Sequence, residues 1–379
     1  MLPLVITIFT NHEGSSMTIS LPSSFNTFDL KFSPLPKLQQ GDKVAILSPS
    51  FIAPAYFPHI YELGLTRLRD VFGLEPIAFP STTNKDATHK EKAADLIEAF
   101  ERPDIKAVIA TIGGDDQIEW VRDLPQRPFQ ENPKPFFGYS DNTHIAHHLW
   151  QCGVPSFYGG ALFIQFARQY EMDSFTVDYL KKALFENSII ELRASETFND
   201  EDLAWEDPAT LAQKRRYQPN DGWHWDLGEI ATPGDFSGIT WGGCLESIDE
   251  LLRHRMPLPT PEQFTNIVLY FATSEELPEA PYVSRILRAL GELGILQRVQ
   301  GVLVGRPKAW SFEKPNTDQM KKAYTEAQMK AVRETVRRYN KEVPIVQNMD
   351  FGHTDPQICL PMGSHTIINC SDQKITISF

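Results

Sequence analysis

Short apolar runs alternate with amphipathic stretches along the first 150 residues. The pattern predicts strands within 41–50, 76–80 and 104–112, and helices over 61–72 and 90–100. Alternation of this kind is typical of a parallel α/β sheet of the Rossmann or flavodoxin type. Because ligands of such sheets bind at the carboxyl ends of the strands, we expect chemistry in the turns there. Gly113-Gly114, directly after the third strand, is one such turn.

A further turn of this kind carries a serine. The apolar pair Phe136-Phe137 meets Gly138, Ser140 follows two residues later, and an amphipathic stretch begins after it. A serine held at the start of a helix lies near free backbone N–H groups and the positive end of the helix dipole, which can stabilise an oxyanion. The order strand, turn, serine, helix is that of a nucleophile elbow. The alternative is an ordinary helix cap formed by Ser140 or Asp141.

The second half repeats the alternation of strands and helices after a segment of different character. That segment is charged and aromatic, and its tryptophans include Trp205; we interpret it as a crossover that can reach over a cleft, although plain packing at a domain junction would explain the tryptophans equally well. We therefore predict a second α/β domain, with the active site where the two domains meet. The predicted segments are an irregular lead-in (1–36), an N-terminal domain (37–180), the crossover with its aromatic substrate loop (181–237) and a C-terminal domain (238–379).

Composition narrows the class of protein. Hydrophobic residues make up 41% of the 379 residues, and the net charge is −13, which argues against nucleic-acid and anionic-membrane partners. The four cysteines are far apart and no apolar run is long enough to span a bilayer. A reducing, cytoplasmic location is therefore expected. The apolar N-terminus lacks a basic flank, so a signal peptide is not expected, and Met17 is an alternative start.

Two groups of histidines are candidates for chemistry. His144 and His148 are spaced so that one helix face could present both to a metal, but no carboxylate follows at the spacing of a metalloprotease. His353 lies in a glycine-flanked loop after a predicted strand. A loop histidine from a second domain is the better candidate for a general base acting on Ser140.

Seven short motifs, taken together, resemble one family. They occur in the order TIGGD (111–115), NPKPFFGYSDNT (132–143), FYGG (157–160), GGCL (242–245), TSEE (273–276), GVLVGRP (301–307) and DFGHTDP (350–356). This series resembles the LD-carboxypeptidase family, the S66 serine peptidases, and within it the microcin C immunity protein branch. The resemblance covers the chain from about residue 41 to its end.

The resemblance implies a serine, histidine and glutamate triad and no metal or organic cofactor. Ser140 matches the nucleophile and His353 the general base. The backbone N–H of Asp141, with one from Gly113 or Gly114, would form the oxyanion hole.

The family's triad glutamate is replaced by Ala272 in this sequence. Alanine cannot orient an imidazole, and loss of the third triad member lowers kcat strongly without abolishing it. Either Glu246 or Glu275 could supply the acid instead. The alanine could also be a deliberate substitution that traps a complex, or the protein could be a binding-only relative.

The resemblance also suggests substrates. Members of the family cleave an amide in muropeptides or in peptidyl- and aminoacyl-nucleotides. Trp205 lies where the family's nucleobase-stacking loop would fall. Arg306, at a strand end, could pair with a carboxylate or phosphate, or could form an interdomain salt bridge. A homodimer is possible by analogy with the family. A doubly wound protein that binds a phosphorylated ligand at its Gly-Gly turn is the alternative outside the family, although no G-x-G-x-x-G or Walker sequence is present.

Overall fold

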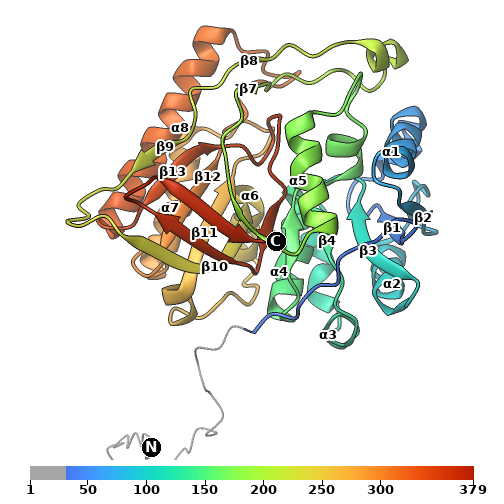
Figure 1. Ribbon diagram of the computed structural model, residues 1–379, viewed down its shortest axis with the longest axis horizontal. Helices are drawn as coiled ribbons and strands as arrows, with labels where there is room; N and C mark the ends of the chain where they lie inside the picture. The colour runs from blue at the N-terminus through green and yellow to red at the C-terminus, as the bar shows by residue number, and fades with distance from the viewer. Residues whose placement is uncertain (1–30) are drawn as a thin grey trace, which may run out of the picture.

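The computed structural model describes residues 31–379, which form two α/β units side by side (Figure 1). The predicted lead-in falls mostly outside these residues, and Met17 falls outside them entirely; residues 31–36 contain no helix or strand. Within 31–379, no helix combines the length and apolar character needed to cross a bilayer.

The N-terminal sheet has six strands in the order β14-β5-β4-β3-β1-β2, all parallel except β14. Its strands are β1 (Lys43–Leu47), β2 (Glu75–Ala78), β3 (Ile105–Ala110), β4 (Phe136–Gly138), β5 (Ser156–Tyr158) and β14 (Leu360–Met362). Its helices are α1 (Pro58–Asp70), α2 (His89–Glu101), α3 (Arg127–Glu131), α4 (Thr143–Gln151) and α5 (Ser174–Phe185). Apart from the exposed Lys106 in β3, the central strands β3 and β4 are apolar and buried on both faces, as expected for a parallel sheet between helices.

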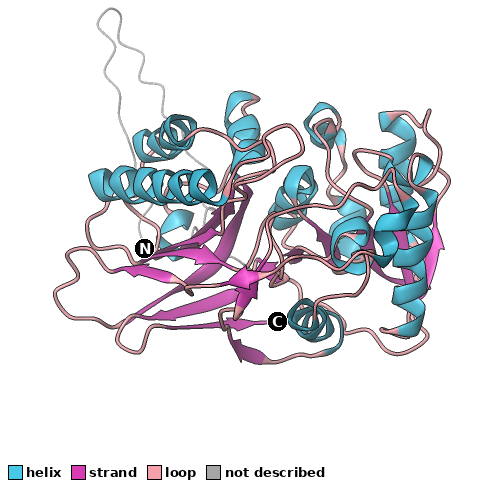
Figure 2. Ribbon diagram, turned by 90° about the horizontal axis from the view of Figure 1, so that it is seen from above, coloured by secondary structure: helices cyan, strands magenta, loops and turns pink. Residues whose placement is uncertain are grey.

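The C-terminal sheet has eight strands in the order β6-β16-β15-β10-β11-β12-β13-β9. Its parallel strands are β10 (Asp235–Cys244), β11 (Ile267–Ala272), β12 (Gly301–Gly305) and β13 (Ile345–Met349), and the antiparallel ones are β6 (Ile189–Glu191), β9 (His224–Asp226), β15 (His365–Asn369) and β16 (Lys374–Ser378). Its helices are α6 (Leu245–Arg253), α7 (Ala280–Glu292) and α8 (Asp318–Tyr339). Figure 2 shows helices packed against the strands of both sheets.

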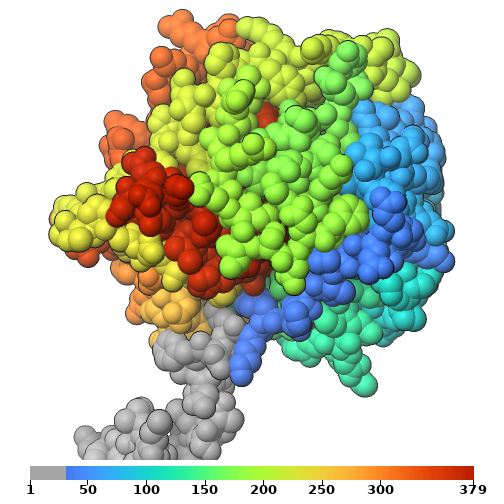
Figure 3. Space-filling model, viewed as in Figure 1, coloured from blue at the N-terminus to red at the C-terminus, as the bar shows by residue number. Residues whose placement is uncertain are grey.

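Two short strands pair with strands that are distant from them in the sequence. β6 comes from the predicted crossover and extends the C-terminal sheet, whereas β14 comes near the end of the chain and pairs with β5 of the N-terminal sheet. One large apolar cluster contains buried residues of both sheets. On the face seen in Figure 3, the green segment that includes α5 covers the junction between the two units. The fold class predicted from the sequence, two α/β domains with largely parallel sheets, is confirmed.

Some predicted elements differ in detail. The sequence around Asp116 and after it predicts a further helix, but the structure has two 3-10 turns there, Gln117–Glu119 and Val121–Asp123, and the five-residue α3. Pro125 interrupts this stretch, because proline cannot continue a helix with its missing N–H group. The predicted crossover (181–237) contains the end of α5 and a small hairpin of β7 (Thr197–Phe198) and β8 (Gln218–Pro219).

Candidate active site

Ser140 lies on a strained turn at the carboxyl end of β4. Its backbone φ is 61°, a left-handed conformation that costs a residue with a side chain about 1–2 kcal/mol. A 3-10 turn, Ser140–Asn142, leads from it directly into α4. This geometry projects a side chain from the strand end in the manner of a nucleophile elbow, and such strain is typical of functional sites.

The glycine loop after β3 packs directly against this turn. A Cβ added to Gly113 would lie 2.9 Å from Ser140 Cβ, so a side chain there would force the two loops apart. The backbone N–H groups of Gly113 and Gly114 donate no hydrogen bond to any residue in 31–379. They are therefore available to a ligand beside Ser140.

The side chain of Asp141 fixes the turn from behind. Its Oδ2 accepts hydrogen bonds from Ser50 Oγ at 2.5 Å and from Gln117 N at 3.1 Å, and its Oδ1 lies 2.9 Å from His144 Nδ1. These three partners come from three different segments. The backbone of the Ser140 turn is thus held by the surrounding structure, which offsets its local strain.

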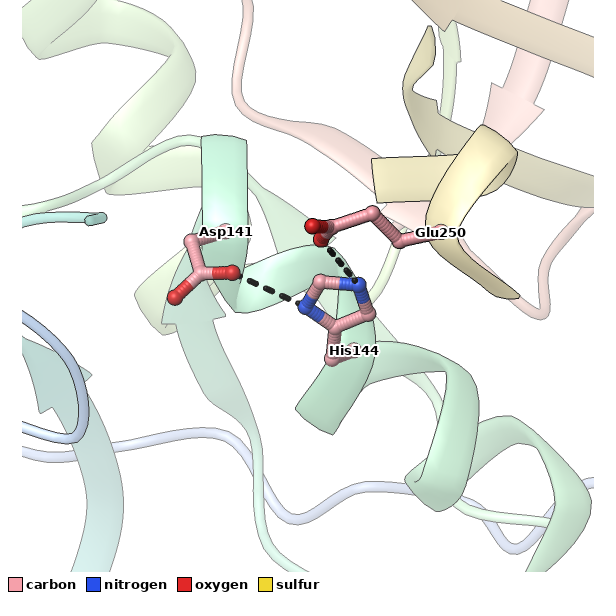
Figure 4. Close-up of side chains that lie close together, drawn as sticks. All are labelled: Asp141, His144 and Glu250. Atoms are coloured by element: carbon pink, nitrogen blue, oxygen red, sulfur yellow. Dashed lines mark hydrogen bonds and ion pairs between the residues drawn. The ribbon is translucent and has the colours of Figure 1, made fainter. Parts of the chain in front are cut away.

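The buried His144 lies between two carboxylates at this point, those of Asp141 and Glu250 (Figure 4). Its Nε2 lies 3.3 Å from Glu250 Oε2 on α6, while Nδ1 faces Asp141. Burial acts to lower the pKa of His144, but bonding to the two carboxylates outweighs burial and raises the pKa to about 9.

The same three side chains are close enough to consider a metal. However, each ring nitrogen of His144 already faces a separate carboxylate. A protonated imidazole bridging Asp141 and Glu250 therefore fits the geometry better than a shared ion. The sequence argues against a metal shared by His144 and His148, and the two rings have separate neighbours, since the His148 ring packs on that of Phe129 at 5.2 Å.

His353 reaches the same region from the loop after β13. It is 8% exposed, and its ring packs against that of Tyr139 at 4.8 Å. His353 Nε2 lies 3.0 Å from Glu275 Oε2, within ion-pair distance, but neither ring nitrogen has an aligned hydrogen bond, and Nδ1 is buried without a partner. No hydrogen bond joins His353 to Ser140 among the described residues.

A cavity of about 250 Å³ contains these groups. It lies where the carboxyl ends of strands from both sheets converge, as expected for α/β sheets. Its lining consists of Phe51, Ile112, Gly113, Gly114, Tyr139, Ser140, Ile164, Arg168, Asp202, Trp205, Glu275, Lys308 and His353. The nucleophile and base candidates thus come from different sheets and meet in one hollow.

The two candidate acids occupy different places. Glu275 contacts His353 as described, whereas Glu246 Oε1 accepts hydrogen bonds from the backbone and side chain of Ser274, at 2.9 and 2.8 Å. Loss of solvation acts to raise the pKa of Glu275, but the charge of His353 and bonding to it outweigh this and lower the pKa to about 2. Glu275 is therefore the carboxylate that the structure brings to the histidine.

Ala272 is fully buried at the end of β11, next to the histidine loop. A Cβ added to Gly352 would lie 2.6 Å from Ala272 Cβ. The residue at which the resemblance predicts a glutamate is thus a neighbour of the residue before His353. A longer acidic side chain at this position would start beside the loop that carries His353.

Of the two predicted substrate-binding residues, Trp205 lines the cavity and Arg306 does not. Trp205 lines the cavity, packs against Phe57 and Phe163 at 5.5 and 5.4 Å, and accepts a hydrogen bond from His59 through its carbonyl oxygen. Arg306 does not line this cavity. It is 2% exposed and donates to Asp350 Oδ1 at 2.6 Å, because the strand end that carries it directs the side chain into the C-terminal unit.

Arg168, Asp202 and Lys308 also line the cavity, and no sequence motif singles them out. Arg168 follows a π-helical turn (Leu162–Phe166), and Asp202 belongs to the crossover. Lys308 lies two residues after Arg306, so the strand end that was singled out does supply a cation to the cavity. Only the tertiary structure shows which residue does so.

Comparison with known proteins identifies relatives over nearly the whole chain. Sequence profiles of the LD-carboxypeptidase N-terminal and C-terminal domains match residues 44–159 and 237–368. The microcin C7 self-immunity protein MccF of Escherichia coli is 23% identical over 78% of this chain and 80% of its own. A Treponema pallidum protein named as a carboxypeptidase is 25% identical over 90% of this chain and 93% of its own.

Solved structures show the same fold. An MccF-like protein from Streptococcus pneumoniae in complex with AMP has a TM-score of 0.77 at 26% identity, covering 89% of this chain and 99% of that one. MccF in complex with aspartyl sulfamoyl adenosine has a TM-score of 0.76 at 22% identity, covering 91% and 98%. The family resemblance predicted from the seven motifs is confirmed.

Proposed function

This chain belongs to the LD-carboxypeptidase family, and from that premise we propose that it is a serine-type amide hydrolase acting from the cavity at Ser140. The family and its named relatives support a hydrolase. The observation that carries the proposal is the strained Ser140 in one small cavity with His353 and the unbonded N–H groups of Gly113 and Gly114.

The reaction would proceed through an acyl-enzyme. Ser140 Oγ attacks the amide carbonyl carbon as its proton passes to His353, and the developing oxyanion accepts hydrogen bonds from Gly113, Gly114 and Asp141 N–H groups. His353 then gives the proton to the leaving amine as the C–N bond breaks. Water, activated by the same histidine, hydrolyses the ester and restores Ser140.

Glu275 would take the part of the missing triad acid. Its carboxylate at 3.0 Å from one ring nitrogen favours the tautomer that carries a proton there, which leaves the other nitrogen free to accept the serine proton. Because 59% of the Glu275 side chain is exposed, we expect it to be a weaker substitute than a buried triad acid.

The substrate would be an amide in a muropeptide or in a peptidyl- or aminoacyl-nucleotide. The similar Streptococcus pneumoniae protein was solved with AMP, which supports testing the nucleotide class. Trp205 in the cavity wall is suited to stack on a planar base.

Hydrolysis tests the proposal directly. Purified protein is offered an L,D-linked muropeptide tetrapeptide and an aminoacyl-sulfamoyl adenosine, with Ser140→Ala as the control. Turnover of either substrate that disappears in the control supports the proposal. Silence of both substrates, even after Ala272→Glu, would contradict the assigned substrate class.

A binding protein without catalysis is the second candidate, and the alanine at position 272, where the resemblance predicts a glutamate, favours it. A fluorophosphonate probe separates the two candidates, because it reacts with an activated serine. Labelling that Ser140→Ala removes would argue against the binding-only function.

A further inference from the structure

A cluster of buried charges forms part of the cavity wall. Arg168 and Lys308 both line the cavity and are 5% and 3% exposed. Lys308 Nζ lies 2.5 Å from Asp202, and Arg168 Nη2 lies 2.5 Å from Asp355. Arg168 Nη1 is also 3.8 Å from Asp202. Arg168 and Lys308 therefore share the carboxylate of Asp202.

Cations outnumber carboxylates in this cluster. Arg215, which does not line the cavity, also pairs with Asp355, at 2.9 Å. Three cations, Arg168, Arg215 and Lys308, thus share Asp202 and Asp355. Burial, and then the charge of Arg168, lower the pKa of Arg215, as expected where positive charge is in excess.

Neighbouring acidic groups are engaged elsewhere. Asp200 and Glu201 pair with Lys321, at 2.8 and 2.6 Å, and Glu275 pairs with His353. Asp173 accepts a hydrogen bond from the backbone of α5. None of these carboxylates forms an ion pair with Arg168 or Lys308, although the charge of Lys308 helps to lower the pKa of Glu275. Three cations therefore share two directly paired carboxylates.

Arg168 also has unused donors. Its Nε is buried without a hydrogen-bond partner, and among the described residues its guanidinium donates one hydrogen bond, to Asp355. A buried cation with unsatisfied donors gains most from an incoming anion, because charge-assisted hydrogen bonds are strong where water is excluded. The excess charge and the unused donors point to the same ligand chemistry.

We propose that Arg168, with Lys308 beside it, binds an anionic carboxylate or phosphoryl group of the substrate and so selects molecules charged near the bond that Ser140 attacks. This inference rests on the proposed function for its biological meaning, but the anion site can be tested by binding alone. Arg168 would then be a specificity-determining residue, in the role that the sequence had assigned to Arg306.

The alternative for Arg168 is a structural brace. Its partner Asp355 lies two residues after His353, so the pair could simply hold the histidine loop. A brace would affect charged and neutral ligands alike, whereas an anion site distinguishes them. Arg215 offers a matched control, because it carries the same charge and contacts the same carboxylate without lining the cavity.

The experiment measures binding to the full chain carrying Ser140→Ala by isothermal titration calorimetry. The ligands are two pairs that differ in charge: AMP against adenosine, and N-acetylalanine against N-acetylalaninamide. We expect at least one charged ligand to bind about tenfold more tightly than its neutral partner, the worth of one charge-assisted hydrogen bond. The pair that shows the preference tells a phosphoryl group from a carboxylate.

Variants locate the preference. Arg168→Gln should abolish it, Arg168→Lys should restore part of it, and Arg215→Gln should leave most of it. Equal loss in Arg168→Gln and Arg215→Gln would overturn direct binding by Arg168, as would the absence of any charge preference in the parent protein. If Arg168→Gln does not fold, Lys308→Met decides: an unchanged preference there overturns the proposal.

Failure of the proposed function would look different. A charge preference without any amide hydrolysis would support the anion site and refute the proposed hydrolase function. Equal hydrolysis of charged and neutral substrates would support the hydrolase function and refute the anion site.

Discussion

Replacing Glu275 with glutamine tests whether this residue serves as the acid. The carboxylate lies 3.0 Å from His353 Nε2, and 59% of the side chain is exposed. Coulomb's law at that distance in a medium like bulk water gives about 1.4 kcal/mol. Because the Glu275 side chain is largely exposed, we use this interaction energy for water and not the far larger one for a dry protein interior. Since 1.4 kcal/mol is a factor of ten, Glu275→Gln should lower kcat/KM about tenfold.

Salt and a matched carboxylate sharpen the assay. Glu246→Gln removes a nearby acidic group that contacts Ser274 instead of His353, so it should change kcat/KM much less. At about 1 M salt the Debye length falls to about 3 Å, and the gap between the parent protein and Glu275→Gln should narrow. Unaltered kcat/KM in Glu275→Gln, or an equal loss in Glu246→Gln, would refute the role of Glu275.

Three further predictions follow from the same site. Ala272→Glu should raise the rate of hydrolysis or of fluorophosphonate labelling and make it insensitive to Glu275→Gln, because the new carboxylate starts beside the histidine loop; no gain would show that it cannot reach His353. Ser140→Gly should raise the free energy of unfolding in urea by about 1 kcal/mol over Ser140→Ala, because glycine tolerates φ of 61°; equal stabilities would mean that the turn relaxes. The pKa of His144 in the folded protein, about 9, is above the unfolded value near 6.5. Protonated His144 therefore adds about 3 kcal/mol to the free energy of unfolding below pH 6.5, and this stabilisation is lost as the pH rises through 9. His144→Gln should remove that alkaline loss of stability, and a persisting loss would assign it to other groups.

Regular elements with strong local patterns could be predicted from the sequence. Strands β1 and β3 are apolar apart from one lysine each, and β4 is apolar throughout. The stretch that forms α4 has helical spacing of apolar residues, so the sequence predicts the turn at Ser140 with its neighbours. Elements that depend on distant pairing were missed. β14 has three residues, one of them proline, and becomes a strand only because β5 lies beside it.

Site residues in local motifs could likewise be predicted from the sequence, whereas those that depend on tertiary contacts could not. The motifs around Ser140 and His353 are local in the sequence, and the structure places both in one cavity. The choice between Glu246 and Glu275 stayed open because each lies close in sequence to Ala272 or to a strand end, and only folding brings one of them to the histidine. Arg306 and Lys308 are two residues apart, yet one is buried against Asp350 and the other lines the cavity. A sequence pattern cannot distinguish their directions at an irregular strand end.

The pairing of β14 with β5 also governs the order in which the protein can assemble during synthesis. The N-terminal sheet lacks its last strand until residue 362 has left the ribosome, so the edge of β5 remains open while most of the C-terminal unit is made. An open edge is a template for pairing with another chain. Nascent chains that stop before β14 should therefore be prone to association, and neither half should be expected to fold as an independent module. The same late strand secures the loop of His353 against the unit that carries Ser140, so the cavity is completed only when the whole chain is.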